Sequence, residues 1–159
     1  MLGESAPVAA VREALEGLAS DAPILVAFSG GLDSTVLLDA AARCRAPATI
    51  VAWHVHHGLQ AQADDWPAHC KAFAETLGTG FGVSRLQGRP SSGESLEEWA
   101  RRGRYAALGD AARQAGAAAI LTAHHADDQV ETVLMRLARG TGLEGAAAMT
   151  ERSWLGAVP

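Results

Sequence analysis

The sequence predicts an α/β domain, an open and mostly parallel sheet with helices on both faces. Short apolar runs at residues 24–28, 49–55 and 119–123 have the continuous hydrophobicity of strands that are buried on both faces. Helical patterns alternate with these runs, as in sheets built from strand–helix–strand units. The 159 residues, 48% hydrophobic and 19% charged, suffice for one core. We therefore expect residues 1–159 to form a single domain.

Periodicity and helix-ending residues predict the other elements. They are expected in this order: helices over 8–19, 33–45 and 66–77, a strand over 81–86, a loop over 88–93 and a helix over 95–116. Pro47 and Gly78 end two of the helices. Ser95 and Glu98 form a capping box at the start of the last one. The loop has the composition of a mobile lid over a site.

A glycine turn joins the first strand to the second helix and predicts a phosphate site. The free N–H groups and the positive dipole end of the helix meet at this turn. Its glycines allow close approach of an anion, and its hydroxyls add donors. No lysine follows, so the turn is not a Walker A loop, and the alternative is an ordinary capped turn. The candidate nucleotide-binding residues here are Ser29, Gly30, Gly31, Asp33 and Ser34. Because Asp33 would repel phosphate, its carboxylate indicates bound Mg²⁺ or an ammonium group.

Three histidines, His54, His56 and His57, end the second strand. Their spacing fits no zinc pattern, and no cysteine pair accompanies them. Ligands bind at the carboxyl ends of strands in open α/β sheets. We therefore expect the loop carrying His56 and His57 to close over a nucleotide.

Arginines occupy the early turns of the helix over 95–116. Arg101 and Arg104 are three residues apart and so are neighbours on the helix surface. Either they lie on a solvated face, or they face phosphate or nucleic acid. The helix dipole does not favour cations near this end, which leaves both interpretations open.

A second site element follows the strand at 119–123. We expect a helix there with a buried stripe of Val130, Val133, Leu134 and Leu137. Its first turns would bring three carboxylates to one side, those of Asp127, Asp128 and Glu131. Helix capping is an alternative for Asp127. Mutual repulsion among three acids indicates a cation, either Mg²⁺ or a substrate ammonium.

These motifs together resemble the tRNA(Ile)-lysidine synthetase family. The residues that carry the resemblance are Ser29–Ser34, His56–Leu59 with Ala63 and Asp64, Ala100–Tyr105 and His124–Gly145. The glycine turn alone resembles the pyrophosphate loop (PP-loop) of adenine nucleotide α-hydrolase-like ATP pyrophosphatases. The resemblance covers most of the chain and implies that PP-loop fold.

The resemblance implies an ATP-dependent ligase that modifies tRNA(Ile) with a CAU anticodon. ATP would adenylate the C2 oxygen of the wobble cytidine, and free L-lysine would then displace AMP to form lysidine. Asp33, Asp128 and Glu131 would receive the lysine, and Asp33 and Asp127 are the candidate Mg²⁺ ligands. Arg104 and His125 would stabilise the intermediate or move protons. The family also has C-terminal tRNA-binding domains, which we expect to be absent from this catalytic part.

Composition limits the other classes of function. The net charge of −5 argues against the chain alone gripping a nucleic acid. No apolar run is long enough to span a membrane, and two cysteines without a CxxC pair suit the cytoplasm. A homodimer is left open. The rival functions are tRNA 2-thiolation, another PP-loop ATP pyrophosphatase, and a non-catalytic nucleotide-binding module.

Overall fold

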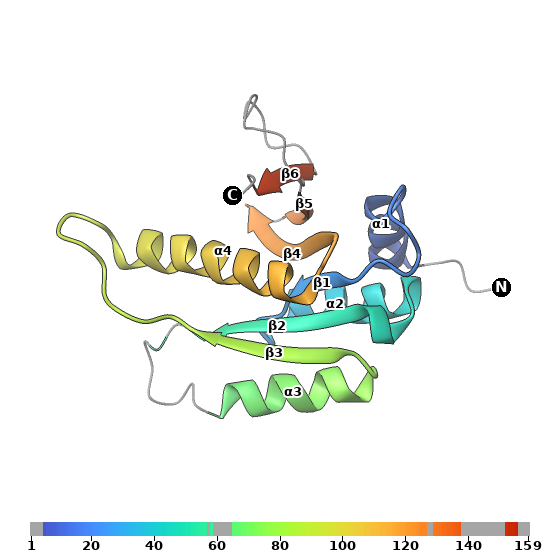
Figure 1. The fold of residues 1–159 in the computed structure, drawn as a ribbon, viewed down its shortest axis with the longest axis horizontal. Coiled ribbons are helices and arrows are strands. Elements are labelled where there is room, and N and C mark those ends of the chain that lie inside the picture. The colour runs from blue at the N-terminus through green and yellow to red at the C-terminus, as the bar shows by residue number, and fades with distance from the viewer. Residues whose placement is uncertain (1–4, 57, 59–64, 127–128, 138–151, 156–159) are drawn as a thin grey trace.

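The computed structural model describes residues 5–56, 58, 65–126, 129–137 and 152–155. Within these ranges six strands form one sheet with the order β3-β2-β1-β4-β5-β6 (Figure 1). The strands are β1 (Ile24–Ala27), β2 (Ile50–His56), β3 (Gly80–Arg85), β4 (Ala119–Ala126), β5 (Gln129–Leu137) and β6 (Arg152–Leu155). The helices are α1 (Ala6–Ala14), α2 (Leu32–Cys44), α3 (Trp66–Thr76) and α4 (Leu96–Ala115), with a 3-10 turn, η1, at Pro47–Thr49.

The order of the strands reverses at β1. Strand β1 pairs in parallel with β2 on one side and with β4 on the other, and β2 pairs in parallel with β3. The chain therefore runs outward from β1 to β3 and then crosses back to β4. Such a reversal leaves a crevice at the carboxyl ends of the two central strands, where open α/β sheets bind ligands. The mostly parallel sheet that the sequence predicts is confirmed.

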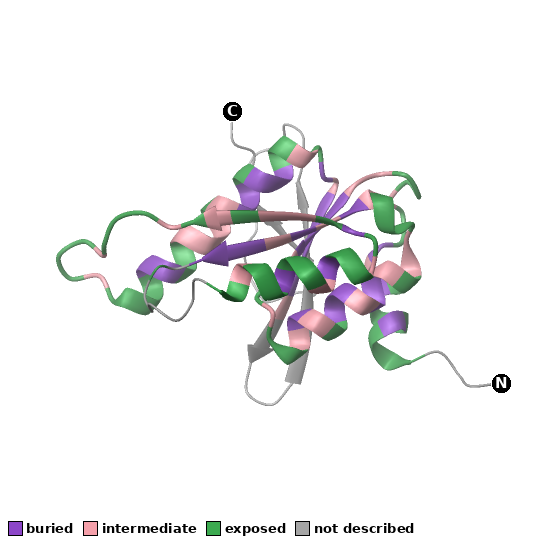
Figure 2. Cartoon of the chain, turned by 90° about the horizontal axis from the view of Figure 1, so that it is seen from below, coloured by how far each residue is buried: buried purple, intermediate pink, exposed green. Residues whose placement is uncertain are grey.

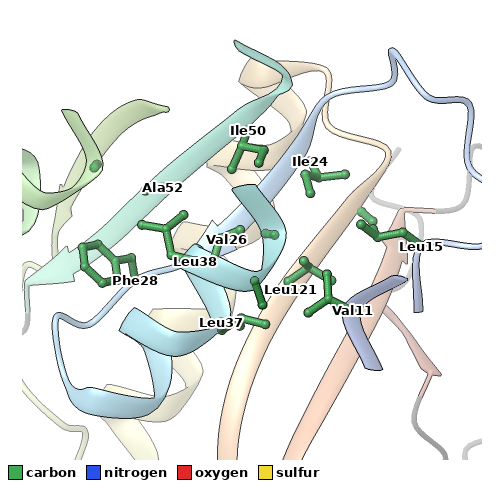
Figure 3. Close-up of a cluster of buried hydrophobic side chains, with 14 of the residues drawn as sticks. Val11, Leu15, Ile24, Val26, Phe28, Leu37, Leu38, Ile50, Ala52 and Leu121 are labelled. Atoms are coloured by element: carbon green, nitrogen blue, oxygen red, sulfur yellow. The ribbon is translucent and has the colours of Figure 1, made fainter. Parts of the chain in front are cut away.

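Helices cover both faces of the sheet, as expected. Val11 of α1 and Leu37 and Leu38 of α2 pack with Ile24 and Val26 on one face (Figure 3). The opposite face is covered by α4 (Figure 1). Leu108 of this helix packs with Leu25 and Ile120. Successive residues of β1 thus enter opposite cores, which is why this strand is apolar throughout. Burial follows the same division, because the central strands are largely buried and the helices expose their outer sides (Figure 2).

The predicted helix boundaries agree with the structure to within a few residues, except that α1 ends at Ala14 rather than near residue 19. Gly78 (φ +71°) follows α3, and Gly116 (φ +62°) caps the end of α4 in the left-handed conformation. None of the helices in the described ranges combines the length and the apolar character needed to cross a membrane.

The helix predicted after residue 123 is wrong. Strand β4 continues to Ala126, and Gln129–Leu137 forms β5, which pairs antiparallel with β4 from Ala126↔Gln129 to Ala119↔Arg136. The segment contains the β-branched residues Val130, Thr132 and Val133, which favour extended structure. Periodicity alone does not distinguish a short apolar run in a strand from one in a helix.

Candidate nucleotide-binding site

Hydroxyl groups order the turn between β1 and α2. The Oγ atoms of Ser29 and Ser34 lie 3.0 Å apart, and Ser34 Oγ also donates to the carbonyl oxygen of Gly31 at 3.0 Å. Thr35 Oγ1 donates to the same oxygen at 2.9 Å, and the Gly31 N–H donates to Ser29 Oγ at 3.3 Å. No side chain caps the start of α2, where Gly31 is the N-cap residue. The positive dipole end of α2 is therefore not capped by a side chain, which suits an anion, although Asp33 lies in this first turn.

Gly30 is required by its conformation and by its neighbours. Its φ is +81°, which an L side chain rarely adopts. A Cβ atom at this position would lie 2.6 Å from Cys70 Sγ and 2.8 Å from Trp66 Nε1. The backbone of the turn can therefore lie against α3 only because residue 30 has no side chain.

Two side chains that the sequence did not assign to the site, His54 and Trp66, bind backbone carbonyl groups at the start of the turn. His54 Nδ1 lies 2.9 Å from the carbonyl oxygen of Phe28, and Trp66 Nε1 donates to the carbonyl oxygen of Ser29 at 2.7 Å. Burial lowers the pKa of His54; the bond to Phe28 raises it, and nearby His56 lowers it further. His54 is therefore favoured in its neutral form. The helical pattern over 66–77 predicts Trp66 on the buried face together with Cys70, Phe73 and Leu77, but Trp66 is 46% exposed.

A cavity of about 290 Å³ opens at the carboxyl ends of β1, β2 and β4, beneath α4. It is lined by Ala27, Phe28, Ser29, Ser34, Trp53, Val55, Arg104, Tyr105, Leu108, Thr122 and Ala123. The hydroxyl-bearing turn thus borders a mostly apolar recess, the composition typical of a small-molecule site. The apolar wall residues have no local sequence signal, because only the strand order brings them together.

Trp53 forms a fixed wall of this cavity. Its Nε1 donates to Ser84 Oγ at 2.9 Å, and its ring lies against Gly82 of the neighbouring strand. A Cβ atom at residue 82 would lie 2.1 Å from the indole ring. The six-membered ring of Trp53 therefore lies over Gly82 of β3, and the side chain forms part of the cavity lining.

The two arginines predicted as phosphate or RNA contacts occupy different environments. Arg104 is half-buried and lines the cavity together with Ser29 and Ser34. Arg101 is exposed and is absent from the lining. The structure therefore brings Arg104, but not Arg101, to the candidate site.

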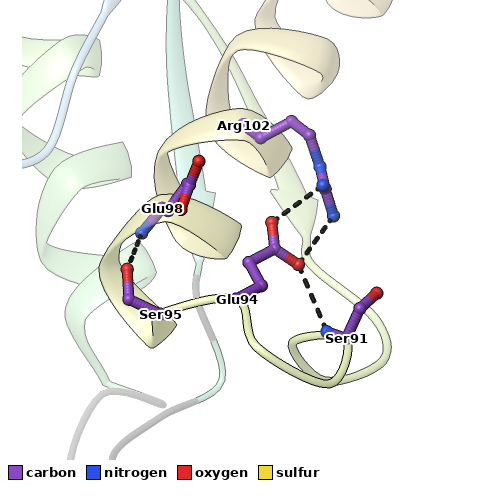
Figure 4. A network of polar contacts seen from close by, with 5 residues as sticks. All are labelled: Ser91, Glu94, Ser95, Glu98 and Arg102. Atoms are coloured by element: carbon purple, nitrogen blue, oxygen red, sulfur yellow. Dashed lines mark hydrogen bonds and ion pairs between the residues drawn. The ribbon is translucent and has the colours of Figure 1, made fainter.

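The loop predicted as a lid is anchored at its end next to α4. Glu94 accepts from the N–H of Ser91 at 3.2 Å and pairs with Arg102 Nη1 at 2.8 Å (Figure 4). Ser95 Oγ accepts from the N–H of Glu98 at 3.1 Å, which confirms the predicted N-cap (Figure 4). Opening and closing of the loop stay a prediction.

The turn, the uncapped helix start and the cavity can be compared with known proteins. The sequence pattern of the PP-loop domain matches residues 7–159. The chain belongs to the PP-loop domain family. The turn at residues 29–34 has the sequence that resembles the loop of this family, and the name PP-loop is used for these residues from here on.

The PP-loop domain is similar to proteins named tRNA(Ile)-lysidine synthase. The one from Burkholderia mallei is 50% identical over 140 residues, which are 88% of this chain and 29% of the relative. The one from Polaromonas naphthalenivorans is 47% identical over 154 residues, 91% and 47% of the two chains. The one from Pseudomonas aeruginosa is 52% identical over 134 residues, 82% and 29%. The chain therefore spans 29 to 47% of the length of these relatives.

A solved structure supports the PP-loop fold independently. An NH3-dependent NAD synthetase from Campylobacter jejuni, in complex with the nitrate ion, superposes with a TM-score of 0.56 and 16% sequence identity. The match covers 73% of this chain and 52% of the synthetase. At this identity the likeness shows the fold alone.

The histidines after β2 are only partly described. His56 is buried, with 4% of its surface exposed, and its Nδ1 accepts from the N–H of Gly58 at 3.1 Å. This bond shapes the turn that leaves the strand. His57 lies outside the described residues, and the predicted contact of both side chains with the nucleotide is untested.

The acidic candidates depend on the segment after β4. Asp127 and Asp128 lie outside the described residues. The backbone of Glu131 is in β5, in register with His124, and His125 is in register with Val130. Asp33 is half-buried in the first turn of α2. The parallel pairing of β1 with β4 makes their carboxyl ends neighbours, as the predicted site requires.

Proposed function

We propose that this PP-loop domain uses ATP to attach free L-lysine to the wobble cytidine of tRNA(Ile) with a CAU anticodon. The product would be lysidine, with release of AMP and pyrophosphate. The observation that carries the proposal is the cavity at the carboxyl ends of β1 and β4, because the PP-loop hydroxyls and Arg104 border the same space. Identity of about 50% to proteins named tRNA(Ile)-lysidine synthase supports the choice of tRNA as the substrate.

The PP-loop would bind the phosphates of the nucleotide, and the cavity would bind its nucleoside part. The N–H groups and hydroxyls of Ser29, Gly30, Gly31 and Ser34 would bind its phosphates at the start of α2. The cavity, of about 290 Å³, is at the lower end of ligand-pocket sizes and suits the nucleoside part. Trp53 would face the base there. His56 and His57 would close over the nucleotide from the end of β2.

Asp33 fits a magnesium ligand. Asp33 is a half-buried residue of the PP-loop, and Mg²⁺ prefers carboxylate oxygens together with substrate phosphates. Bound Mg²⁺ would neutralise part of the phosphate charge. Asp127, outside the described residues, is the second candidate ligand.

Two displacements would complete the reaction. In the first, the cytosine C2 oxygen attacks the α-phosphorus of ATP and pyrophosphate leaves, while the Arg104 guanidinium stabilises the developing negative charge. In the second, the lysine ε-amine attacks C2, the bond from C2 to the AMP oxygen breaks, and AMP leaves. Asp33, Asp128 and Glu131 would hold the lysine, and His125 would accept the proton that the amine loses.

A labelled-lysine assay tests the proposal. The chain is incubated with ATP, Mg²⁺, labelled lysine and a tRNA transcript carrying CAU, and incorporated lysine and AMP are measured. We expect equal amounts of both, and a large loss in Asp33→Asn. The matched control is Asp39→Asn on the same helix, because Asp39 pairs with exposed Arg43 at 2.8 Å. ATP binding without turnover, also when this domain is joined to the C-terminal part of one of its relatives, would instead support a non-catalytic nucleotide-binding module.

Thiolation of tRNA would need a reactive cysteine. Cys70 is fully buried, and burial raises the pKa of its thiol to about 11. Cys44 is half-buried, and its Sγ contacts the carbonyl oxygen of Val8 at 3.4 Å. A thiol with so high a pKa supplies little thiolate near neutral pH, so Cys70 does not suit thiolation, and this favours the lysine reaction. Sulfur incorporation without lysine uptake would overturn this choice.

The cytoplasmic location, the homodimer and the single-domain organisation stay predictions of the sequence.

A further inference from the structure

Two side chains from outside the PP-loop bind two successive carbonyl groups at its start. His54, from β2, reaches the oxygen of Phe28 at 2.9 Å, and Trp66, the first residue of α3, reaches the oxygen of Ser29 at 2.7 Å. Because a carbonyl oxygen can only accept, the proton of the His54 imidazole is on Nδ1 in this contact. Each bond therefore fixes the orientation of one peptide plane immediately before Gly30.

The orientation of these two planes determines where two N–H donors point. The described residues contain no cis peptide bond, and in a trans peptide the C=O and N–H groups point in opposite directions. Holding the Phe28 oxygen toward His54 turns the Ser29 N–H away from His54. Holding the Ser29 oxygen toward Trp66 likewise turns the Gly30 N–H away from Trp66. Neither N–H donates to another residue in the described part of the chain.

The packing around Trp66 suits such a role better than a role in the core. Its ring is 46% exposed, although its Nε1 is engaged with the PP-loop. The space next to the ring is open to the backbone only because Gly30 has no Cβ. Cys70 Sγ also lies close to the loop, 3.8 Å from His54 Nδ1 and 2.6 Å from the position that a Cβ atom of residue 30 would take. Trp66 thus supports the loop through its N–H donor while much of its side chain stays exposed. This contact of Trp66 with the loop is called the brace.

We propose that His54 and Trp66 are positioning residues that orient the Ser29 and Gly30 N–H groups for the phosphates of the nucleotide. This inference rests on the proposed function only in that the PP-loop binds nucleotide phosphates. It assigns no contact between either side chain and the substrate. It predicts that loss of either side-chain donor weakens binding of the phosphates and leaves binding of the nucleoside unchanged.

Calorimetry with ATP and with adenosine tests this prediction. Trp66→Phe keeps an aromatic ring and removes the donor, and His54→Leu removes the other donor. One neutral hydrogen bond is worth roughly 3- to 10-fold in affinity. We therefore expect each variant to weaken ATP–Mg²⁺ binding by about that factor and to leave adenosine binding within about twofold. His54→Asn, whose amide can donate from near the Nδ1 position, should restore much of the ATP affinity. Trp99→Phe, on α4 and 8% exposed, is the control for loss of an indole N–H elsewhere in the chain and should change neither affinity.

The outcomes separate this role from the proposed function. Equal losses for ATP and adenosine, or unchanged ATP binding in a folded Trp66→Phe variant, would overturn the positioning role alone. A wild-type chain that binds neither ligand would overturn the nucleotide site, and the positioning role with it. If His54→Leu does not fold, as judged by circular dichroism, Trp66→Phe alone decides the question.

Discussion

Replacing Gly30 with alanine tests how tightly the PP-loop is packed against α3. Two effects add at this position. A left-handed backbone costs an L residue about 1–2 kcal/mol. The new Cβ would also lie 2.8 Å from Trp66 Nε1 and 2.6 Å from Cys70 Sγ. Trp66 must then shift and lose its bond to the Ser29 carbonyl, at a further cost of about 1 kcal/mol. We expect Gly30→Ala to lower the free energy of unfolding by roughly 2–3 kcal/mol.

Gly88 supplies the matched control. Its φ is +92°, but no atom lies within 4 Å of its Cβ position. Gly88→Ala should therefore show the backbone effect alone, about 1–2 kcal/mol. Urea denaturation followed by circular dichroism measures both variants, and an unchanged m-value shows that the same surface is exposed on unfolding. Cys70→Ala in the Gly30→Ala background should recover part of the loss, because it removes the nearest contact.

A loss in Gly30→Ala no larger than that in Gly88→Ala would refute this reasoning. It would mean that α3 moves freely away from the PP-loop. The brace formed by Trp66 would then lose its physical basis as well.

Three further predictions concern other parts of the fold. Ser95→Ala should destabilise the chain by about 0.5–2 kcal/mol through loss of the α4 cap, whereas Ser92→Ala in the exposed loop should have little effect, both measured by urea denaturation. Gly82→Ala should displace Trp53, whose ring would lie 2.1 Å from the new Cβ, and an unchanged tryptophan emission spectrum would contradict it. Because burial lowers the pKa of His54 below its ordinary 6.5, the unfolded chain takes up this proton at a higher pH than the folded chain. The free energy of unfolding should then fall as the pH drops below 6.5, by at most about 1.4 kcal/mol per pH unit, and titrations of wild type and His54→Asn should differ by this slope.

The sequence predicts the PP-loop and the parallel half of the sheet because both depend on local signals. The loop follows from a short apolar strand, two adjacent glycines and a helix start, and each has its own physical cause. The Ser95 cap follows from a side chain and an N–H three residues apart. The strand after residue 128 was predicted as a helix, since its apolar spacing is compatible with either period and only pairing with β4 decides between them.

The sequence could not predict which residues line the cavity, because the lining depends on strand order. It also could not predict that Trp66 supports the PP-loop. Trp53 comes from β2 and Tyr105 from α4, and they line one cavity only because β2 and β4 flank β1. Trp66 was assigned to the core on hydrophobicity, whereas the structure uses its single N–H donor at the surface. A residue with an apolar body and one polar atom is ambiguous until the acceptor is known.

The position of Arg104 favours positive charge at the carboxyl end of β1 and negative charge at the carboxyl end of β4. The start of α2 and the Arg104 guanidinium place positive charge around the PP-loop and the cavity. A carboxylate cluster within that space would weaken phosphate binding, so a cationic substrate needs its acids on a different strand. The end of β4 is the neighbouring strand end, and neighbouring parallel strands lie about 4.8 Å apart. If the proposed function holds, acids carried there would be close enough to hold the amine of the lysine next to the cavity while leaving the phosphate donors free. Asp33 is then the one acid inside the PP-loop. Its presence there is explained if a cation lies between its carboxylate and the phosphates of the nucleotide.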